Sequence, residues 1–250
     1  MTATTIDEVL GFLDEIIETS KEEQSTLGYF AALYRKVTQQ VKDKIGQHFF
    51  DDDARMELLD VTFANRYLAA YTGYKAGTEI TESWQVAFEA SENSKLIVLQ
   101  HLLAGMNAHI NLDLGIAAAE ITDTQTIHSL QGDFNKINDI LGALVGEVEK
   151  DLSEIWPFLL WILKVTKKVD NFLINFSMNI AREGAWLFAN ELVFRDAGTT
   201  LNEMIAKRDK KIAKLGQSIV KPGRIERFIF RIIRFGERGT VADKITALQN

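Results

Sequence analysis

The sequence predicts a single all-α domain spanning residues 1–250, built as a bundle-like array of long helices. Apolar residues recur with the helical period of about 3.6 over most of the chain, and no convincing alternating strand occurs. Proline is found only at positions 157 and 222, so long helices are permitted nearly everywhere. No internal repeat, low-complexity tract or clear interdomain linker divides the chain.

The helices expected in the first half begin at recognisable signals. Asp7 and Glu8 lie in the first turn of the first helix, where carboxylates favour the positive helix end. The acidic cluster of residues 51–53 suits the N-cap and first turn of the third helix. The expected ranges of the first four helices are about 5–20, 22–48, 52–75 and from 81 to a break near 91–94.

Five further helices are expected in the second half. A long central helix comes first, one later helix bends at Pro157, and Pro222 with Gly223 introduces the last. Their ranges are about 93–120, 124–149, 152–190, 200–215 and 224–235.

Composition fits a folded globular protein. Hydrophobic residues make up 46% and charged residues 25% of the 250 positions, which argues against disorder. The absence of cysteine excludes a disulfide framework, thiolate metal ligands and cysteine nucleophiles. The N-terminus lacks the pattern of a secretory signal, so we expect a cytoplasmic protein. The longest apolar run, 155–163, falls well short of the roughly 20 residues that span a bilayer.

The central helix carries polar residues where a core helix needs apolar ones. Residues 101–113 read HLLAGMNAHINLD, and burying a neutral polar group without a partner costs about 1–3 kcal/mol. On a helical wheel Gln100, Asn107 and Asn111 share one flank. His109 and Asp113 are four residues apart, so they can share one ion or one hydrogen bond. His101 lies about 12 Å from His109 along the axis and cannot join it on one metal ion.

Two other helices contain similar polar intrusions. In LLDVTFANRYLAAY, Asp60 is surrounded by apolar residues and needs a histidine, an arginine or a cation as partner. In NIAREGAWLFANEL, Arg182 and Trp186 are one turn apart and continue a stripe from Asn175 and Asn179.

These blocks resemble a bacterial all-helical family known only as a domain of unknown function. The resemblance extends from about residue 55 to residue 190, and the block around 95–119 is its most specific part. It implies a shared site but brings no established activity. The recurring polar positions of the family are Asp60, Asn65, Arg66, His101, Asn107, His109, Asn111, Asp113, Arg182 and Trp186.

A fainter similarity links HLLAGMNAH to the histidine-rich segment of zinc-dependent phospholipase C and related nucleases. Those helical enzymes hold zinc ions with histidines and aspartates, including a helical His-x-x-x-Asp pair. This chain departs from the pattern, because Gly105 replaces an aspartate and only four histidines are present. A full three-zinc site is therefore not expected, whereas a one- or two-metal site rich in carboxylates stays open.

Three interpretations of the polar residues remain open. They form a satisfied buried network that fixes helix packing, they line a pocket for a small ligand, or Asp60, His109 and Asp113 ligate a divalent metal ion. In a hydrolase the ion would activate water and Arg182 would steady an anionic group. Without a metal, His101 or His109 would act as general base. The residues expected to bind the ligand are Asn65, Arg66, Asn107, Asn111 and Trp186.

The alternative to a pocket is a non-catalytic structural or membrane-peripheral protein. In the segment 224–235 arginines recur at i, i+3, i+7 and i+10 beside an apolar remainder. Residues 207–250 hold twelve Lys or Arg against four Asp or Glu, a local charge of +8, so the other residues sum to −15. The basic helix can therefore dock on the acidic body or attach to an anionic membrane surface. Nucleic acid is the least favoured partner, because no recognised module accompanies the basic patch.

Overall fold

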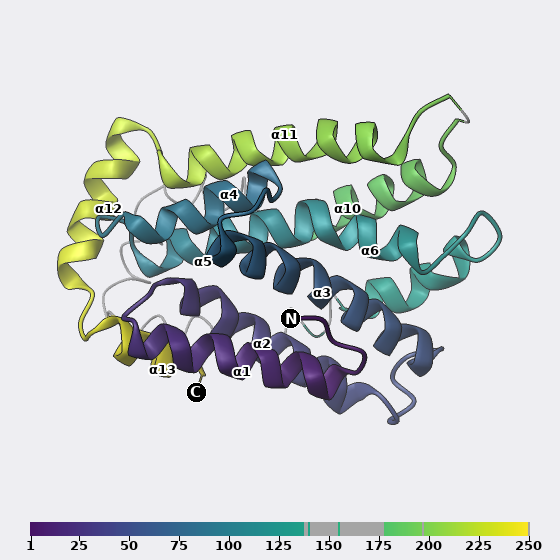
Figure 1. The fold of residues 1–250 in the computed structure, drawn as a ribbon, viewed down its shortest axis with the longest axis horizontal. Helices are drawn as coiled ribbons and strands as arrows, with labels where there is room; N and C mark the ends of the chain where they lie inside the picture. Colours follow the sequence, from purple (N-terminus) through teal and green to yellow (C-terminus); the bar gives the residue numbers. More distant parts are fainter. Residues whose placement is uncertain (138–139, 141–154, 156–177, 197, 250) are drawn as a thin grey trace.

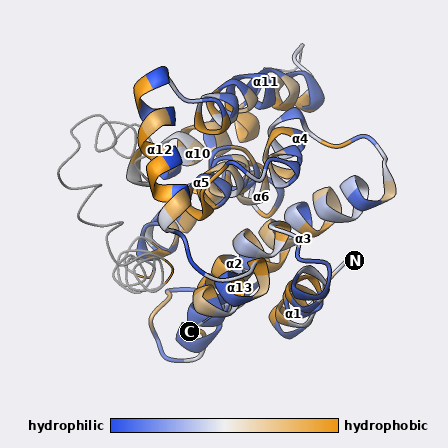
Figure 2. Ribbon diagram, turned by 90° about the vertical axis from the view of Figure 1, so that its left-hand side faces the viewer, coloured by the Kyte–Doolittle hydropathy of each residue, from blue (hydrophilic) through white to orange (hydrophobic). Residues whose placement is uncertain are grey.

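The computed structural model describes residues 1–137, 140, 155, 178–196 and 198–249, and every regular element among them is helical. The all-α prediction is therefore confirmed. The helices lie along the long axis of the molecule, and α12 (Arg224–Gly236) crosses one end of it (Figure 1). Viewed from that end, the helices form two groups that pack against each other (Figure 2).

The first group contains the N-terminal helices and the C-terminal one. Its members are α1 (Ile6–Glu22), α2 (Leu27–Lys44), α3 (Asp53–Ala76) and α13 (Val241–Gln249). Thr5 caps α1 by accepting a hydrogen bond from the Glu8 amide, and Asp52 caps α3 by accepting from the Arg55 amide, as the acidic cluster predicted. Helix α3 ends at Gly77, whose positive φ of 68° suits glycine.

The second group surrounds the central helix. Its members are α4 (Glu82–Glu89) with the short η1 (Ala90–Glu92), α5 (Val98–Ala108), η2 (His109–Asp113), α6 (Leu114–Glu120), α10 (Met178–Val193) and α11 (Leu201–Val220). Elements α5, η2 and α6 run continuously as the central helix and together contact α2, α3, α4, α10 and α11. Between Val98 and Ala118 only Leu99 and Met106 are not fully buried. The polar residues of this stretch therefore lie in the core, as the sequence predicted.

The structure differs from the sequence-based ranges at several places. Helix α2 begins at Leu27 rather than near 22, because Gln24 adopts a positive φ of 51° in the connecting turn. The central helix starts at Val98, and α13 was not predicted. The end of the helix expected at 124–149, most of the helix expected at 152–190, and most of the apolar run 155–163 lie outside the described residues. The single-domain assignment stays a prediction.

None of the helices in the described ranges combines the length and apolar character that crossing a bilayer requires.

Candidate functional site

The carboxylate of Asp113 is the centre of the polar core. Its side chain is 1% exposed and accepts hydrogen bonds from three different elements. Trp84 Nε1 of α4 donates to Oδ2 over 2.7 Å, and Arg66 Nε of α3 donates to Oδ1 over 2.9 Å. His109 Nδ1, one turn earlier on the central helix, lies 3.2 Å from Oδ2. A buried carboxylate is stabilised by such a set of donors, because its charge is paired and both oxygens are satisfied.

His109 is enclosed by aromatic rings. Its imidazole stacks on Phe63 with ring centroids 3.6 Å apart and lies 4.6 Å from Tyr34. Burial lowers the pKa of His109 below its usual value, and the hydrogen bond to Asp113 only partly offsets this effect. The imidazole is therefore neutral near pH 7. Because an ionised carboxylate only accepts, Nδ1 carries the hydrogen, and the buried Nε2 keeps a lone pair without a hydrogen-bond partner among the described residues.

The His109–Asp113 segment is one turn of π-helix inside an otherwise α-helical run. The amide of Leu114 donates to the carbonyl of His109, five residues back, instead of four. Such single turns widen the helix locally and are frequent at functional sites. Here the π-turn contains both members of the His-x-x-x-Asp pair that the sequence singled out.

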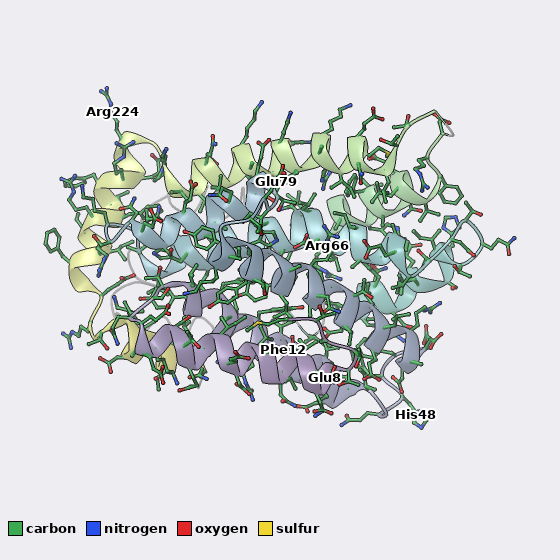
Figure 3. All side chains as sticks on the ribbon, viewed as in Figure 1. Glu8, Phe12, His48, Arg66, Glu79 and Arg224 are labelled. Carbon is green, nitrogen blue, oxygen red and sulfur yellow. The ribbon has the colours of Figure 1, made fainter. Side chains whose placement is uncertain are left out.

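A cleft of about 540 Å³ opens above Asp113. The buried Asp113 and Trp84 form its floor together with Arg66. Ala69 and Ala70 of α3 line one side, and Ile205, Ala206 and Lys210 of α11 line the other. Figure 3 labels two of the residues that border the cleft, Arg66 and Glu79, near the middle of this face of the molecule.

Charges of both signs line the cleft. Arg66 donates through Nε to Asp113 and through a longer contact of 3.4 Å to Glu120, so part of its guanidinium has no partner among the described residues. The oxygens of Asp209 accept from the Glu82 and Ser83 amides over 2.7 and 2.9 Å and cap the N-terminus of α4. Lys210, Glu79 and Glu82 make no ion pair within the described residues.

A family model described as a family of unknown function, DUF5995, matches residues 6–222. The chain belongs to this family. No curated protein and no solved structure matches it. The DUF5995 match includes the whole cleft and the earlier-noted range 55–190, whereas α12 and α13 lie beyond its end. The similarity to zinc-dependent phospholipase C has no counterpart in these comparisons.

Among the polar residues that the sequence singled out, Asp60 does not join Asp113 in a metal centre. No group of three His, Asp or Glu side chains that could hold a metal ion is found in the described parts of the chain. Asp60 is buried in α3, its Oδ2 has no hydrogen-bond partner in those parts, and burial raises its pKa to about 7. The oxygens of Asp113 are occupied by nitrogen donors. The predicted metal ligation by Asp60, His109 and Asp113 therefore has no geometric support.

His101 lies in a different environment from His109. Its ring packs edge-on against Tyr29 of α2 at 5.6 Å. Burial and the nearby cations of Arg234 and Lys244 lower the pKa of His101 to about 4. The two histidines predicted as catalytic candidates are thus not brought together.

The amides on the other flank of the central helix attach it to α11. Gln100 Nε2 donates to the carbonyl of Ile219 over 2.8 Å, and Asn107 Nδ2 donates to that of Ile212 over 3.0 Å. Asn111 Nδ2 in turn donates to Asn107 Oδ1 over 3.2 Å. These bonds satisfy buried groups and fix the packing of two helices, so they provide no support for the predicted ligand-binding roles of Asn107 and Asn111.

Asn65, Arg182 and Trp186 also lie away from the cleft. Asn65 forms two hydrogen bonds with the backbone of Ala3, of 2.7 and 2.8 Å, and so holds the N-terminal segment. On α10, Arg182 donates to the carbonyl of Phe134 and lies 5.5 Å from that ring. The ring of Trp186 packs on the same Phe134 at 4.9 Å. Of the predicted ligand-binding residues, only Arg66 borders the cleft.

Of the residues that line the cleft, the sequence singled out only Arg66 and Asp113, and it missed Trp84, Asp209 and Lys210 among others. The signal that could have found Trp84 is its indole nitrogen, which needs a hydrogen-bond acceptor when the ring is buried. Asp209 and Lys210 lie in a charged run, DKK, that resembles an ordinary solvated helix face. The burial of Asp209 beneath α4 becomes visible only once α11 is placed.

Proposed function

We propose that the protein binds a small organic anion in the cleft between α3, α4 and α11. The observation that supports this most directly is the hydrogen bond from Arg66 to the buried Asp113 at the cleft floor. A guanidinium anchored through Nε by a carboxylate is fixed in orientation, and its remaining N–H groups are available as donors. This arrangement is suited to holding a carboxylate or a phosphate.

The other charges of the cleft narrow the ligand class. Lys210 on α11 offers a second cation, whereas Glu79 and Glu82 place two carboxylates at the border. A polyanion would be repelled by these carboxylates, while a molecule with one anionic group and a cationic or hydrogen-bond-donating group would satisfy both sets. Ile80 and Ile205 supply apolar surface for its remainder. We therefore propose a small zwitterion, such as an amino acid, or a singly charged organic acid.

The proposal is for binding rather than catalysis. His109 is the only imidazole near Asp113 among the described residues, and it does not line the cleft. Its Nε2 is enclosed by Phe63 and Tyr34, so a ligand seated in the cleft would contact Arg66 and not the imidazole. We assign His109 the role of orienting Asp113, which in turn orients Arg66.

A ligand screen with matched variants tests the proposal. Thermal shifts are measured with amino acids, monocarboxylates, dicarboxylates and phosphate monoesters, and ligands that stabilise the protein are titrated by calorimetry. Arg66→Lys keeps the positive charge but loses the planar fork, so we expect affinity to fall about tenfold or more. Lys210→Gln is expected to weaken binding several-fold. Lys207→Gln, on the exposed surface of α11 outside the cleft, is the matched control and should bind as the parent does.

Two outcomes would contradict this function. One is that no compound of the four classes raises the melting temperature. The other is that Arg66→Lys binds a stabilising ligand as tightly as the parent. In either case the polar core would be explained by helix packing alone.

A further inference from the structure

Helix α12 presents a strip of large apolar side chains to solvent. Ile225, Phe228, Ile232 and Phe235 are 49%, 63%, 44% and 87% exposed. They are spaced at i, i+3, i+7 and i+10 and so lie on one side of the helix. Among the described residues this one helix provides half of the large hydrophobic side chains that are exposed. Single exposed hydrophobic residues are ordinary, but a continuous apolar strip indicates a surface that binds a membrane or another protein.

The opposite side of α12 fixes the helix to the body. Phe230 and Ile233 are buried in the core, and Arg234 Nε donates to the carbonyl of Ser94 over 2.9 Å. Directly after the helix, Glu237 accepts from the Val98 amide at the start of α5 over 2.8 Å. The helix therefore does dock on the body, through Phe230, Ile233 and one of the four arginines of the predicted basic face, Arg234, and it leaves the apolar strip facing outward.

An arginine row runs beside the apolar strip. Arg224, Arg227 and Arg231 are exposed and are spaced at i, i+3 and i+7. On a helical wheel their mean direction lies about 90° from that of the strip. None of the three makes an ion pair with a described residue. Their charges are therefore available to an external partner.

From this combination we propose that α12 attaches the protein to the surface of an anionic lipid bilayer. Phe228 and Phe235 enter the boundary between head groups and acyl chains, and the arginine row pairs with lipid phosphates. Nucleic acid would satisfy the arginines but would leave the apolar strip in water. The acidic remainder of the chain is repelled by an anionic surface, so the end formed by α12 faces the membrane.

The position of α12 at one end of the molecule makes the helix accessible to a membrane surface. The helix crosses one end of the molecule, between α11 and α13 (Figure 1). Arg224 projects from this end, whereas Arg66 and Glu79 lie near the middle of the molecule (Figure 3). Attachment therefore leaves the cleft open, and the two proposals are independent.

Vesicle flotation tests the attachment with the full-length protein. We compare vesicles of phosphatidylcholine alone with an equal mixture of phosphatidylcholine and phosphatidylglycerol. The parent should float with the mixture, sink with phosphatidylcholine alone, and float less as salt is raised. In Phe228→Ser/Phe235→Ser flotation should fall to background. In Arg224→Gln/Arg227→Gln/Arg231→Gln the partition constant should fall on the order of a hundredfold, since each arginine near an anionic surface contributes roughly a factor of five.

Two variants serve as matched controls. Leu58→Ser/Leu187→Ser removes two exposed apolar residues from α3 and α10. Lys207→Gln/Lys211→Gln/Lys214→Gln removes three exposed cations from α11, where no apolar strip adjoins them. Both should float as the parent does. All variants change exposed positions, and unchanged melting temperatures establish that each is folded.

Four results would overturn the proposal. The first is that the parent fails to float with the anionic mixture. The second is that the phenylalanine variant floats as well as the parent. The third is that the lysine variant loses as much flotation as the arginine variant, which would indicate general charge attraction. The fourth is that the parent self-associates in sedimentation while the phenylalanine variant is monomeric and neither floats, since the strip would then bury against a second copy of the chain.

Discussion

Trp84 Nε1 and Asp113 Oδ2 are joined by a hydrogen bond of 2.7 Å, although 29 residues separate them in the chain. The bond connects α4 to the π-turn of the central helix and leaves Oδ1 to Arg66 of α3. Three segments are thus tied to one carboxylate. The geometry of the cleft floor consequently depends on Asp113 keeping its contacts with Trp84, Arg66 and His109.

We predict that Trp84 and Asp113 are energetically coupled. Trp84→Phe should lower the free energy of unfolding by about 1.5–3 kcal/mol, because a hydrogen bond to a charged group is lost. Asp113→Asn should cost about 3 kcal/mol or more, because its amide nitrogen would face the donors of Trp84 or Arg66 and leave one of them without an acceptor. Denaturant unfolding of both single variants and the double variant measures the coupling.

The double variant should be less unstable than the sum of the two singles. Trp186→Phe, a matched substitution on α10, controls for the loss of ring area. If the losses of unfolding free energy caused by Trp84→Phe and Asp113→Asn simply add in the double variant, the two side chains are not energetically coupled.

The sequence predicted this core in part. Helical periodicity located most described helices, and the premise that polar residues of the central helix are buried was correct. The shared flank of Gln100, Asn107 and Asn111 was also correct, since all three point to one neighbourhood beside α11. A helical wheel, however, does not state which neighbour covers each flank. For that reason the assignment of Asn107 to a ligand pocket could not be separated from a packing role.

The cleft itself could not be predicted, for two physical reasons. The π-turn at His109–Asp113 adds a residue to one turn, and no residue type in that segment demands it. The partners of Asp113 come from helices whose rotation depends on the packing of the entire core. Trp84 therefore resembled an ordinary aromatic core residue until its nitrogen was located against the carboxylate.

Asp60→Asn is predicted to stabilise the protein increasingly as pH rises. The folded state holds the Asp60 proton up to about pH 7, whereas an unfolded aspartate loses it near pH 4. The folded state therefore binds more protons between these values, and stability contributed by this carboxyl is lost as pH increases. Asparagine has no proton to lose. The gain should be small near about pH 4 and level off above about pH 7, with an upper limit of about 4 kcal/mol.

Thermal unfolding between about pH 5 and pH 8 measures this difference. Asp43→Asn, the same replacement of a carboxyl by an amide at an exposed position of α2, is the matched control. A gain for Asp60→Asn that is the same at both ends of the range would show that its carboxyl is not protonated in the fold.

Gly105→Ala is predicted to destabilise the contact between α5 and α2. A Cβ at this position would lie 2.6 Å from ring atoms of Phe30, closer than carbon atoms normally approach. Relief requires a shift of Phe30, which also packs edge-on against Trp84 and His109. Overpacking of this kind costs about 1–3 kcal/mol. Gly11→Ala is a matched helical control with no atom near the new methyl group, and it should raise stability by up to about 1 kcal/mol.

Denaturant unfolding of the two alanine variants should therefore shift in opposite directions. An unchanged free energy of unfolding in Gly105→Ala would contradict the close contact between α5 and Phe30 of α2.

The ion pair between Glu237 and Lys244 should respond asymmetrically to loss of either partner. Their charged atoms lie 3.2 Å apart, and each side chain is only 5% exposed. In Glu237→Gln the ammonium of Lys244 stays buried without its counter-ion, so we expect a cost of about 3–5 kcal/mol. In Lys244→Met the carboxylate keeps Arg234 at 3.5 Å and the Val98 amide, so the cost should be smaller. The double variant should recover most of the loss, because no unpaired charge stays buried.

His101 provides an independent reporter of the same charges. Because Lys244 is one of the cations that lower the pKa of His101 to about 4, Lys244→Met should raise that pKa, and Glu237→Gln should not. Titration of the His101 ring signals by NMR in the parent and both variants measures the shift. The pKa should remain below the usual value of about 6.5 even in Lys244→Met, since burial of the imidazole is its largest cause and is unchanged by the substitution. An unchanged pKa in Lys244→Met would show that the Lys244 ammonium lies farther from the imidazole than the structure places it.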